Sequence, residues 1–140
     1  MPPRVRIRVE SLVYPTEDRE KVRGALLNIF PTLSFDCANQ GERMLLIGEG
    51  NSISDLSQIS DLIHKDRISD SARRIFRSNA VSGKTIVYLN KQVATVKQVS
   101  FCAPEGESPL GPITLTLESD RLDEVIDLLA PKTHHYQRGT

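Results

Sequence analysis

The fold is decided first by the stretch RVRIRVE at residues 4–10, in which polar and apolar side chains alternate without exception. In an extended chain its two valines and its isoleucine fall on one side and its arginines on the other. This period of two predicts a strand over residues 4–14 with one buried and one solvated face. Leu12 and Val13 break the period, which predicts a bulge before Pro15 ends the strand.

Helical spacing and period-two alternation of apolar residues predict the other elements along the chain. Apolar residues at helical spacing predict helices over residues 17–30, 53–63, 67–78 and 121–129, with Thr16 and Ser52 as the N-caps of the first two. Alternating or short apolar runs predict strands over residues 33–38, 43–48, 84–89, 93–101 and 113–118. Asn90-Lys91 is expected to be the turn of a hairpin that joins the third and fourth of these strands.

This order of elements predicts the α+β class. Strand, helix, two strands, two helices, three strands and a helix are typical of two layers, with helices on a largely antiparallel sheet. No repeat or linker interrupts the chain, so we expect one domain over residues 1–133 and a flexible tail over residues 134–140. The Pro- and Gly-rich residues 104–112 are expected to form a loop.

Composition narrows the classes of function. The 140 residues are 26% charged and 39% hydrophobic, which is typical of a globular chain. Eighteen Lys and Arg balance eighteen Asp and Glu, so no overall field attracts nucleic acid or an anionic membrane. No signal-like or membrane-length apolar run is present, and we expect a cytoplasmic protein without a membrane partner.

Charge is nevertheless uneven along the chain. Residues 65–97 carry a net charge of +6, and residues 98–131 carry a net charge of −6. The basic segment supplies the candidate RNA-binding residues, which are Arg73, Arg74, Arg77, Lys84 and Lys91, with Arg4, Arg6 and Arg8 as weaker candidates. We favour the alternative that these bases pair with acids of the same chain or of a second subunit, because the domain is neutral and has few aromatic residues.

Two short motifs resemble nucleotide-binding loops, but neither lies in the structural context that such a loop requires. Ser82-Gly83-Lys84-Thr85 contains the GKT of a phosphate-binding loop, but it lies between a helix and a strand, and the first glycine of that motif is replaced by Ser78. Gly48-Glu49-Gly50 is better explained as a tight entry into a helix than as a dinucleotide-binding turn. We therefore expect no catalytic residues, no cofactor and no small-molecule substrate.

Histidines and cysteines do not form a metal site in the sequence. His134 and His135 are adjacent in the tail, and His64 is expected on a helix surface. Cys37 continues the alternation of its strand and is expected to be a small buried residue. Cys102 has no Cys or His at ligand spacing, so we expect both thiols to be inert and no metal to be bound.

Several longer phrases resemble an archaeal family known as uncharacterised protein family 0201, sometimes described as a predicted exosome subunit. These phrases are YPTED followed by EKV (residues 14–18 and 20–22), NIFP (28–31), YLNKQ (88–92), ESPLGP (107–112) and LAP (129–131). The resemblance implies a fold similar to that of the ribosomal protein that binds 5S rRNA, and pairing as dimers. It implies no activity, cofactor or catalytic residue.

Three hypotheses of different classes follow. The leading one is a non-enzymatic, cytoplasmic archaeal interaction domain that forms a homodimer. The alternative is an RNA-binding protein that docks on structured RNA, in association with an exosome or a ribosome, through the basic segment. A third is an enzyme with a cleft near residues 48–52, which requires a concave site with convergent polar groups.

Overall fold

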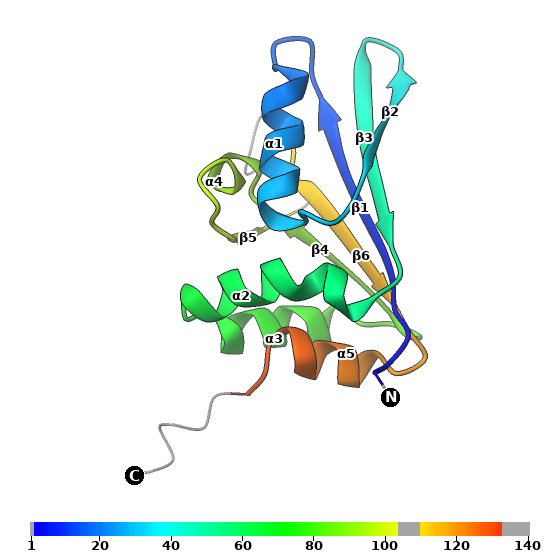
Figure 1. Cartoon of the computed structure of the whole chain (residues 1–140), viewed down its shortest axis with the longest axis vertical. Coiled ribbons are helices and arrows are strands. Elements are labelled where there is room, and N and C mark those ends of the chain that lie inside the picture. Colours follow the sequence, from blue (N-terminus) through cyan, green and yellow to red (C-terminus); the bar gives the residue numbers. More distant parts are fainter. Residues whose placement is uncertain (1, 104–109, 133–140) are drawn as a thin grey trace.

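A computed structural model describes residues 2–103 and 110–132 and confirms the α+β class, with a six-stranded antiparallel sheet and helices (Figure 1). The strands are β1 (Arg6–Val13), β2 (Phe35–Gln40), β3 (Arg43–Gly50), β4 (Lys84–Leu89), β5 (Phe101–Cys102) and β6 (Ile113–Glu118). The helices are α1 (Arg19–Ile29), the 3₁₀ turn η1 (Ile53–Leu56), α2 (Ser57–Lys65), α3 (Ser69–Ser78), α4 (Lys91–Ala94) and α5 (Leu122–Leu129). The loop residues 104–109 and the tail 134–140 lie outside the described residues.

The sheet has the strand order β2-β3-β1-β6-β4-β5, and every neighbouring pair is antiparallel. β1 lies inside the sheet, where Val9 is opposite Gly48 of β3 and Leu115 of β6. Because side chains alternate along each strand, one face receives the apolar residues and the other receives Arg6, Arg8 and their neighbours. We call the second, helix-free side of the sheet the open face.

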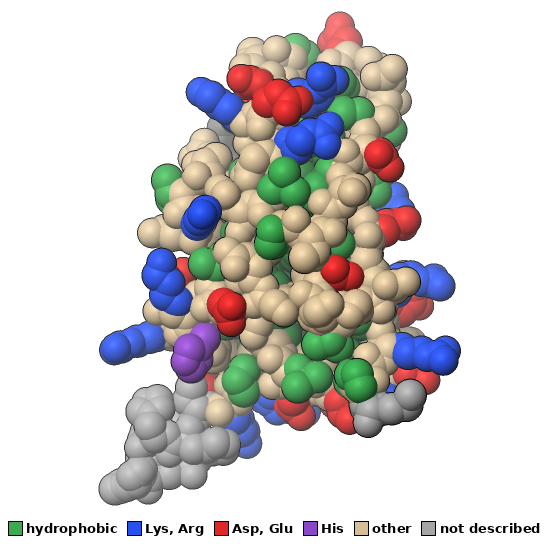
Figure 2. All heavy atoms as spheres, viewed as in Figure 1, with side chains coloured by type: hydrophobic (Ala, Val, Ile, Leu, Met, Phe, Trp, Pro, Cys, Tyr) green, Lys and Arg blue, Asp and Glu red, His purple; other side chains and the backbone are tan. Residues whose placement is uncertain are grey.

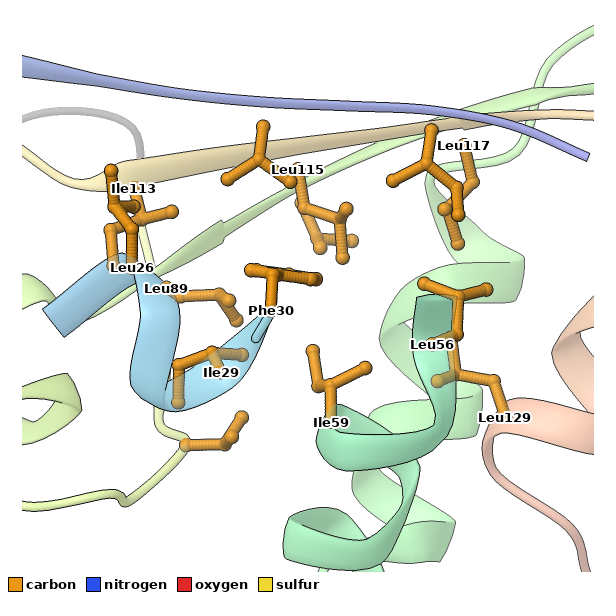
Figure 3. Packing of buried hydrophobic residues seen from close by; sticks show 14 of the residues in the cluster. Leu26, Ile29, Phe30, Leu56, Ile59, Leu89, Ile113, Leu115, Leu117 and Leu129 are labelled. Carbon is orange, nitrogen blue, oxygen red and sulfur yellow. The ribbon is translucent and has the colours of Figure 1, made fainter. Parts of the chain in front are cut away.

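The core lies between the other face of the sheet and the helices (Figure 3). Ile113, Leu115 and Leu117 of β6 point toward the helical layer, where Phe30 and Ile59 meet them. All five side chains are fully buried. The alternation seen in the sequence therefore fixes which side of the sheet faces the helices.

Two expected details at the start of the chain are wrong. β1 has no bulge: its register runs unbroken to Val13, because the small side chain of Ser11 occupies a buried position with 2% exposure. The first helix is capped by Asp18 and not by Thr16, since the Asp18 carboxylate accepts a hydrogen bond from Glu20 N. A polar residue at an inward position thus masked the continuing period.

The expected hairpin between strands 84–89 and 93–101 is also wrong. Asn90 acts as the N-cap of α4, accepting hydrogen bonds from Gln92 N at 2.8 Å and Val93 N at 3.1 Å. Its φ is −70°, so it does not use the left-handed conformation that a tight hairpin turn needs. The chain makes one helical turn, and only the two residues of β5 return to pair with β4.

The Ser82-Gly83 sequence forms the turn that leads into β4. Both residues have positive φ, 51° and 80°, and Val81 and Lys84 exchange two backbone hydrogen bonds across them. A Cβ atom on Gly83 would lie 2.8 Å from Ser119 O, so glycine is required for the close approach of the two chain segments. The GKT sequence is a tight turn and not a phosphate-binding loop.

Candidate binding surfaces

The five candidate RNA-binding residues are not brought together by the fold. Arg73 ties α3 to α5, with Nη1 2.5 Å from Asp127 Oδ1 and a side chain only 14% exposed. Arg74 and Arg77 are exposed on α3, and no carboxylate of the described residues lies within 4 Å of either guanidinium. Lys84 lies on the open face, opposite Glu118, while α3 packs against the other face of the sheet.

Lys91 is buried, with 4% exposure, and is not available to a ligand on the surface. Its ammonium group donates hydrogen bonds to Leu12 O at 2.8 Å, Leu110 O at 2.7 Å and Glu17 Oε1 at 3.1 Å, and it lies 5.7 Å from the centre of the Tyr14 ring. Burial lowers the pKa of Lys91, and the hydrogen bond and charge of Glu17 oppose this shift. The lysine therefore joins three separate segments of the chain, which are residues 12–17, Leu110 and its own helix α4.

These contacts were missed by reasoning from the sequence, although one signal was present. Residues 14–18, residues 88–92 and residues 110–112 belong to the phrases that carry the family resemblance, and they meet around Lys91. No local spacing relates a lysine to a glutamate 74 positions earlier. The phrases thus mark an internal ion pair.

Other bases also pair within the chain. On the open face Arg8 contacts Glu10 at 3.4 Å and Glu49 at 3.1 Å, and Arg6 lies 3.9 Å from Glu118. The hydrogen bond to Glu10 and the charges of both glutamates raise the pKa of Arg8. The arginine stripe predicted from the sequence of β1 is therefore interleaved with Glu10 of the same strand and with acids of β3 and β6.

The open face also carries apolar side chains. Leu12 of β1 is opposite Leu45 of β3, and Ile47 follows two positions along β3. Ile86 and Tyr88 lie on the β4 side of the same face, and Ile86 is 37% exposed. The central strands β1 and β6 separate these two apolar groups by polar side chains, which include Glu10, Thr114 and Thr116. Exposed apolar side chains mixed with paired charges are typical of a protein-binding surface.

The opposite, helical side of the molecule shows no basic field. In Figure 2 the Lys and Arg side chains alternate with Asp and Glu, and most of the surface is uncharged. Hydrophobic side chains gather in the lower part of that view, where α5 borders α2. A cavity of about 220 Å³ between these helices is lined by Leu56, Val125 and Leu128, among others.

The third hypothesis placed a cleft near residues 48–52, and a shallow pocket of about 490 Å³ lies there. Its carboxylate Asp55 is occupied in fixing the chain, because Oδ1 accepts a hydrogen bond from Thr32 Oγ1 at 2.6 Å and Oδ2 accepts one from Ser52 N at 3.3 Å. Ser52 and Asp55 form the expected capping box. Asp55 of this pocket therefore has a structural role.

Cys37 is exposed, so the expectation that it is buried is wrong. It lies on the helix side of β2, where Arg23 Nη2 approaches its sulfur at 3.8 Å. Among residues 2–103 and 110–132, no three His, Cys, Asp or Glu side chains are grouped as in a metal site. The described helices include none with the length and apolar character needed to span a membrane.

The fold is that of an α+β protein in which helices cover one face of the sheet and the other is the open face (Figure 1). Comparison with known proteins identifies its family. A protein-family model described as RNA binding matches residues 6–119. A UPF0201 protein of Sulfolobus acidocaldarius is 39% identical over 128 residues, which cover 91% of this chain and 88% of that protein. The UPF0201 protein of Pyrococcus abyssi is 37% identical over 127 residues, covering 91% and 90%. The chain belongs to the archaeal UPF0201 family.

Solved structures agree with this assignment. The crystal structure of the UPF0201 protein from Methanococcus jannaschii is 30% identical, with a TM-score of 0.80 over 91% of this chain and 94% of that one. A protein from Archaeoglobus fulgidus, at 23% identity, shares the fold with a TM-score of 0.64. The function of the family is not established, and no enzyme is named among these relatives.

Proposed function

We propose that this protein is a non-enzymatic interaction domain that forms a homodimer through the open face of its sheet. The observation that carries this proposal is the composition of that face. Leu12, Leu45 and Ile47 lie together on β1 and β3 with the helices on the other side of the sheet, so their apolar surface faces away from the core. Covering such a surface is favourable at about 25 cal/mol per Å² of apolar area.

The charges of the open face favour a second copy of the chain as the partner. Four bases (Arg6, Arg8, Arg43 and Lys84) share this face with four acids (Glu10, Asp36, Glu49 and Glu118). A two-fold dimer brings the same patch of both subunits together, so the patch must complement itself. A balanced face meets this condition, whereas a polyanion would meet as many repulsive as attractive charges.

Sedimentation at micromolar concentration tests the dimer and its surface together. We expect a mass near twice the 15.6 kDa of the chain for the wild type and a monomer mass for Leu45→Glu, because the new carboxylate would be buried without a partner. Leu128→Glu is the matched control, since Leu128 is an exposed leucine (51%) of α5 and should leave the dimer intact. A monomeric wild type, or a dimer that survives Leu45→Glu, would contradict the proposal.

A second candidate function is the binding of structured RNA, which the description of the matching family model favours. Two of the residues considered above remain suitable for it: Arg74 and Arg77 are exposed, without a carboxylate of the described residues within 4 Å. Lys65 and Arg67, which precede α3, add two further exposed bases. Guanidinium groups with these properties can contact phosphates without first breaking an ion pair.

The salt dependence of RNA binding tests this second candidate function. Binding of a ribosomal RNA fragment should weaken as salt rises, with a log–log slope of about −0.7 to −0.9 per phosphate contacted. The double change Arg74→Glu and Arg77→Glu should weaken it, and Arg19→Glu with Lys21→Glu on α1 is the matched control. Absence of binding at about 50 mM salt would exclude the candidate.

A further inference from the structure

A large cavity of the described structure lies at one end of the sheet, where Arg6 and Glu118 of the open face border it. It is an open groove of about 970 Å³. Four segments far apart in the sequence line it, through residues that include Arg4, Arg6, Asn51, Ser82, Glu118 and Asp120. The groove is about 20 Å from Leu12, because six extended residues of about 3.3 Å each separate Leu12 from Arg6.

Ser119 makes the floor of this groove rigid. Its side chain is almost fully buried, and its hydroxyl donates a hydrogen bond to Arg4 O and accepts one from Arg121 N at 3.0 Å. Its backbone N donates to Gly83 O at 2.9 Å. One residue thus holds the N-terminal segment, the turn before β4 and the start of α5 in fixed relative positions.

One set of groups in the groove can bind an anion. The Arg4 guanidinium has no carboxylate within 4 Å among the described residues, and the Arg6 side chain is 81% exposed with only a long 3.9 Å contact to Glu118. Over the part of the chain that the structure describes, no hydrogen bond uses the backbone N–H groups of Ser82 and Gly83. Arginine and backbone N–H groups are the usual ligands of a phosphate.

A second set of groups can accept hydrogen bonds. The carboxylates of Glu118 and Asp120 line the same groove as the two arginines. These acids make the groove unsuitable for a ligand that presents only phosphates. Carboxylates do, however, bind the hydroxyl groups of ribose in nucleotide sites, where they accept both of the donated hydrogens.

We infer that this groove binds a ribonucleoside phosphate, with the phosphate at Arg4 and Arg6 and the ribose hydroxyls at Glu118 and Asp120. The two sets of side chains come from β1, its N-terminal extension, the end of β6 and the β6–α5 connection, and the groove places them together. A free nucleotide and the 3′ end of an RNA strand present this same chemistry. The inference shares its ligand class with the second candidate function but uses different residues.

Calorimetric titration with 5′-AMP and with 2′-deoxy-5′-AMP tests the assignment of the ribose. Loss of one hydrogen bond to a charged acceptor is expected to weaken binding at least about tenfold, so the deoxynucleotide should bind that much less tightly. Asp120→Asn should reduce this preference while the phosphate is still bound. Equal affinity for the two nucleotides would overturn the inference.

Variants of the arginines test the assignment of the phosphate. Arg4→Ala with Arg6→Ala should weaken the binding of AMP at least about tenfold, whereas Arg74→Ala with Arg77→Ala should have no effect. Circular dichroism checks that each variant is folded. The single change Arg4→Ala, outside the open face, should weaken the binding of AMP while sedimentation shows the oligomeric state of the wild type. If only Arg74→Ala with Arg77→Ala weakens the binding of AMP, this site is wrong, and the dimer proposal is unaffected.

A short single-stranded RNA with a free 3′ end distinguishes the two sources of the ligand. If the RNA binds and the same RNA with a 3′-phosphate binds at least about tenfold less tightly, the groove holds an RNA end. If AMP binds and the RNA does not, the ligand is a free nucleotide. If neither AMP nor RNA binds at millimolar concentration, the inference is wrong.

Discussion

Lys91 shows at the scale of one residue how this protein satisfies a buried charge. All the hydrogens of its ammonium group have partners within 3.1 Å, on Glu17 and on two backbone carbonyls. Such a pair contributes little when compared with apolar residues of equal volume, but removing one partner leaves the other charge buried and alone. The stability of the fold should therefore depend on the lysine much more than on an exposed base.

Replacement of Lys91 by methionine tests this dependence. Lys91→Met should lower the free energy of unfolding by about 3–5 kcal/mol, because the Glu17 carboxylate and two carbonyls lose their donor. Lys21→Met, at an exposed position of α1, should change it by no more than about 0.5 kcal/mol. Urea denaturation measures both, and similar losses for the two variants would show that the buried pair has no special role.

The lowered pKa of Lys91 also predicts a pH dependence. Between that pKa and the unfolded value of about 10.5, the unfolded chain binds more protons at this site than the folded protein. The stability of the wild type relative to Lys91→Met should therefore rise as the pH increases through this window. Denaturation of both proteins from about pH 8 to about pH 10 measures the difference, and a decrease would contradict the sign of the shift.

At the scale of elements, two glycines should respond to alanine in opposite ways. Gly83 has a φ of 80° and would place a Cβ atom 2.8 Å from Ser119 O, so Gly83→Ala should destabilise the protein by about 1–3 kcal/mol. Gly24 lies within α1 with no atom within 4 Å of the added Cβ, so Gly24→Ala should stabilise it by about 0.5–1 kcal/mol. Thermal denaturation of the two variants measures both signs.

The elements also show how far local sequence patterns reach. Period-two alternation located β1 and β6 and assigned their faces correctly, because each pattern is contained within its own strand. The segment after Asn90 was misread, because its apolar residues fit a strand, whereas Lys91 is held in a helical turn by its contacts with Leu12 of β1 and with Glu17 in the turn before α1. Tertiary contacts decided this segment, and they leave no local pattern.

The candidate surfaces were less predictable than the elements for the same reason. Helical spacing grouped Arg73, Arg74 and Arg77 on one side of α3, but only the fold shows that Arg73 is paired with Asp127 of another helix. The sequence predicted pairing between basic and acidic segments in general terms. It could not name the partners, because half of the ion pairs among the described residues join positions far apart in the chain.

At the scale of the whole molecule, the buried apolar residues form one continuous cluster from β1 to α5. A single core predicts one cooperative unfolding transition, as expected for one domain. Far-ultraviolet circular dichroism and tyrosine fluorescence should therefore report the same midpoint. If the chain pairs as proposed, this midpoint should rise with protein concentration. Two separated transitions would instead indicate independently folding parts.

The strand order has a further consequence for synthesis of the chain. β1 leaves the ribosome first, but its partner β6 begins at Ile113, more than 90 residues after β1 ends. At about 5–20 residues per second, one side of β1 waits several seconds for its partner. Only β3 can pair with it during that time. One edge of β1, which is interior in the finished sheet, therefore stays without a strand partner until β6 has been synthesised.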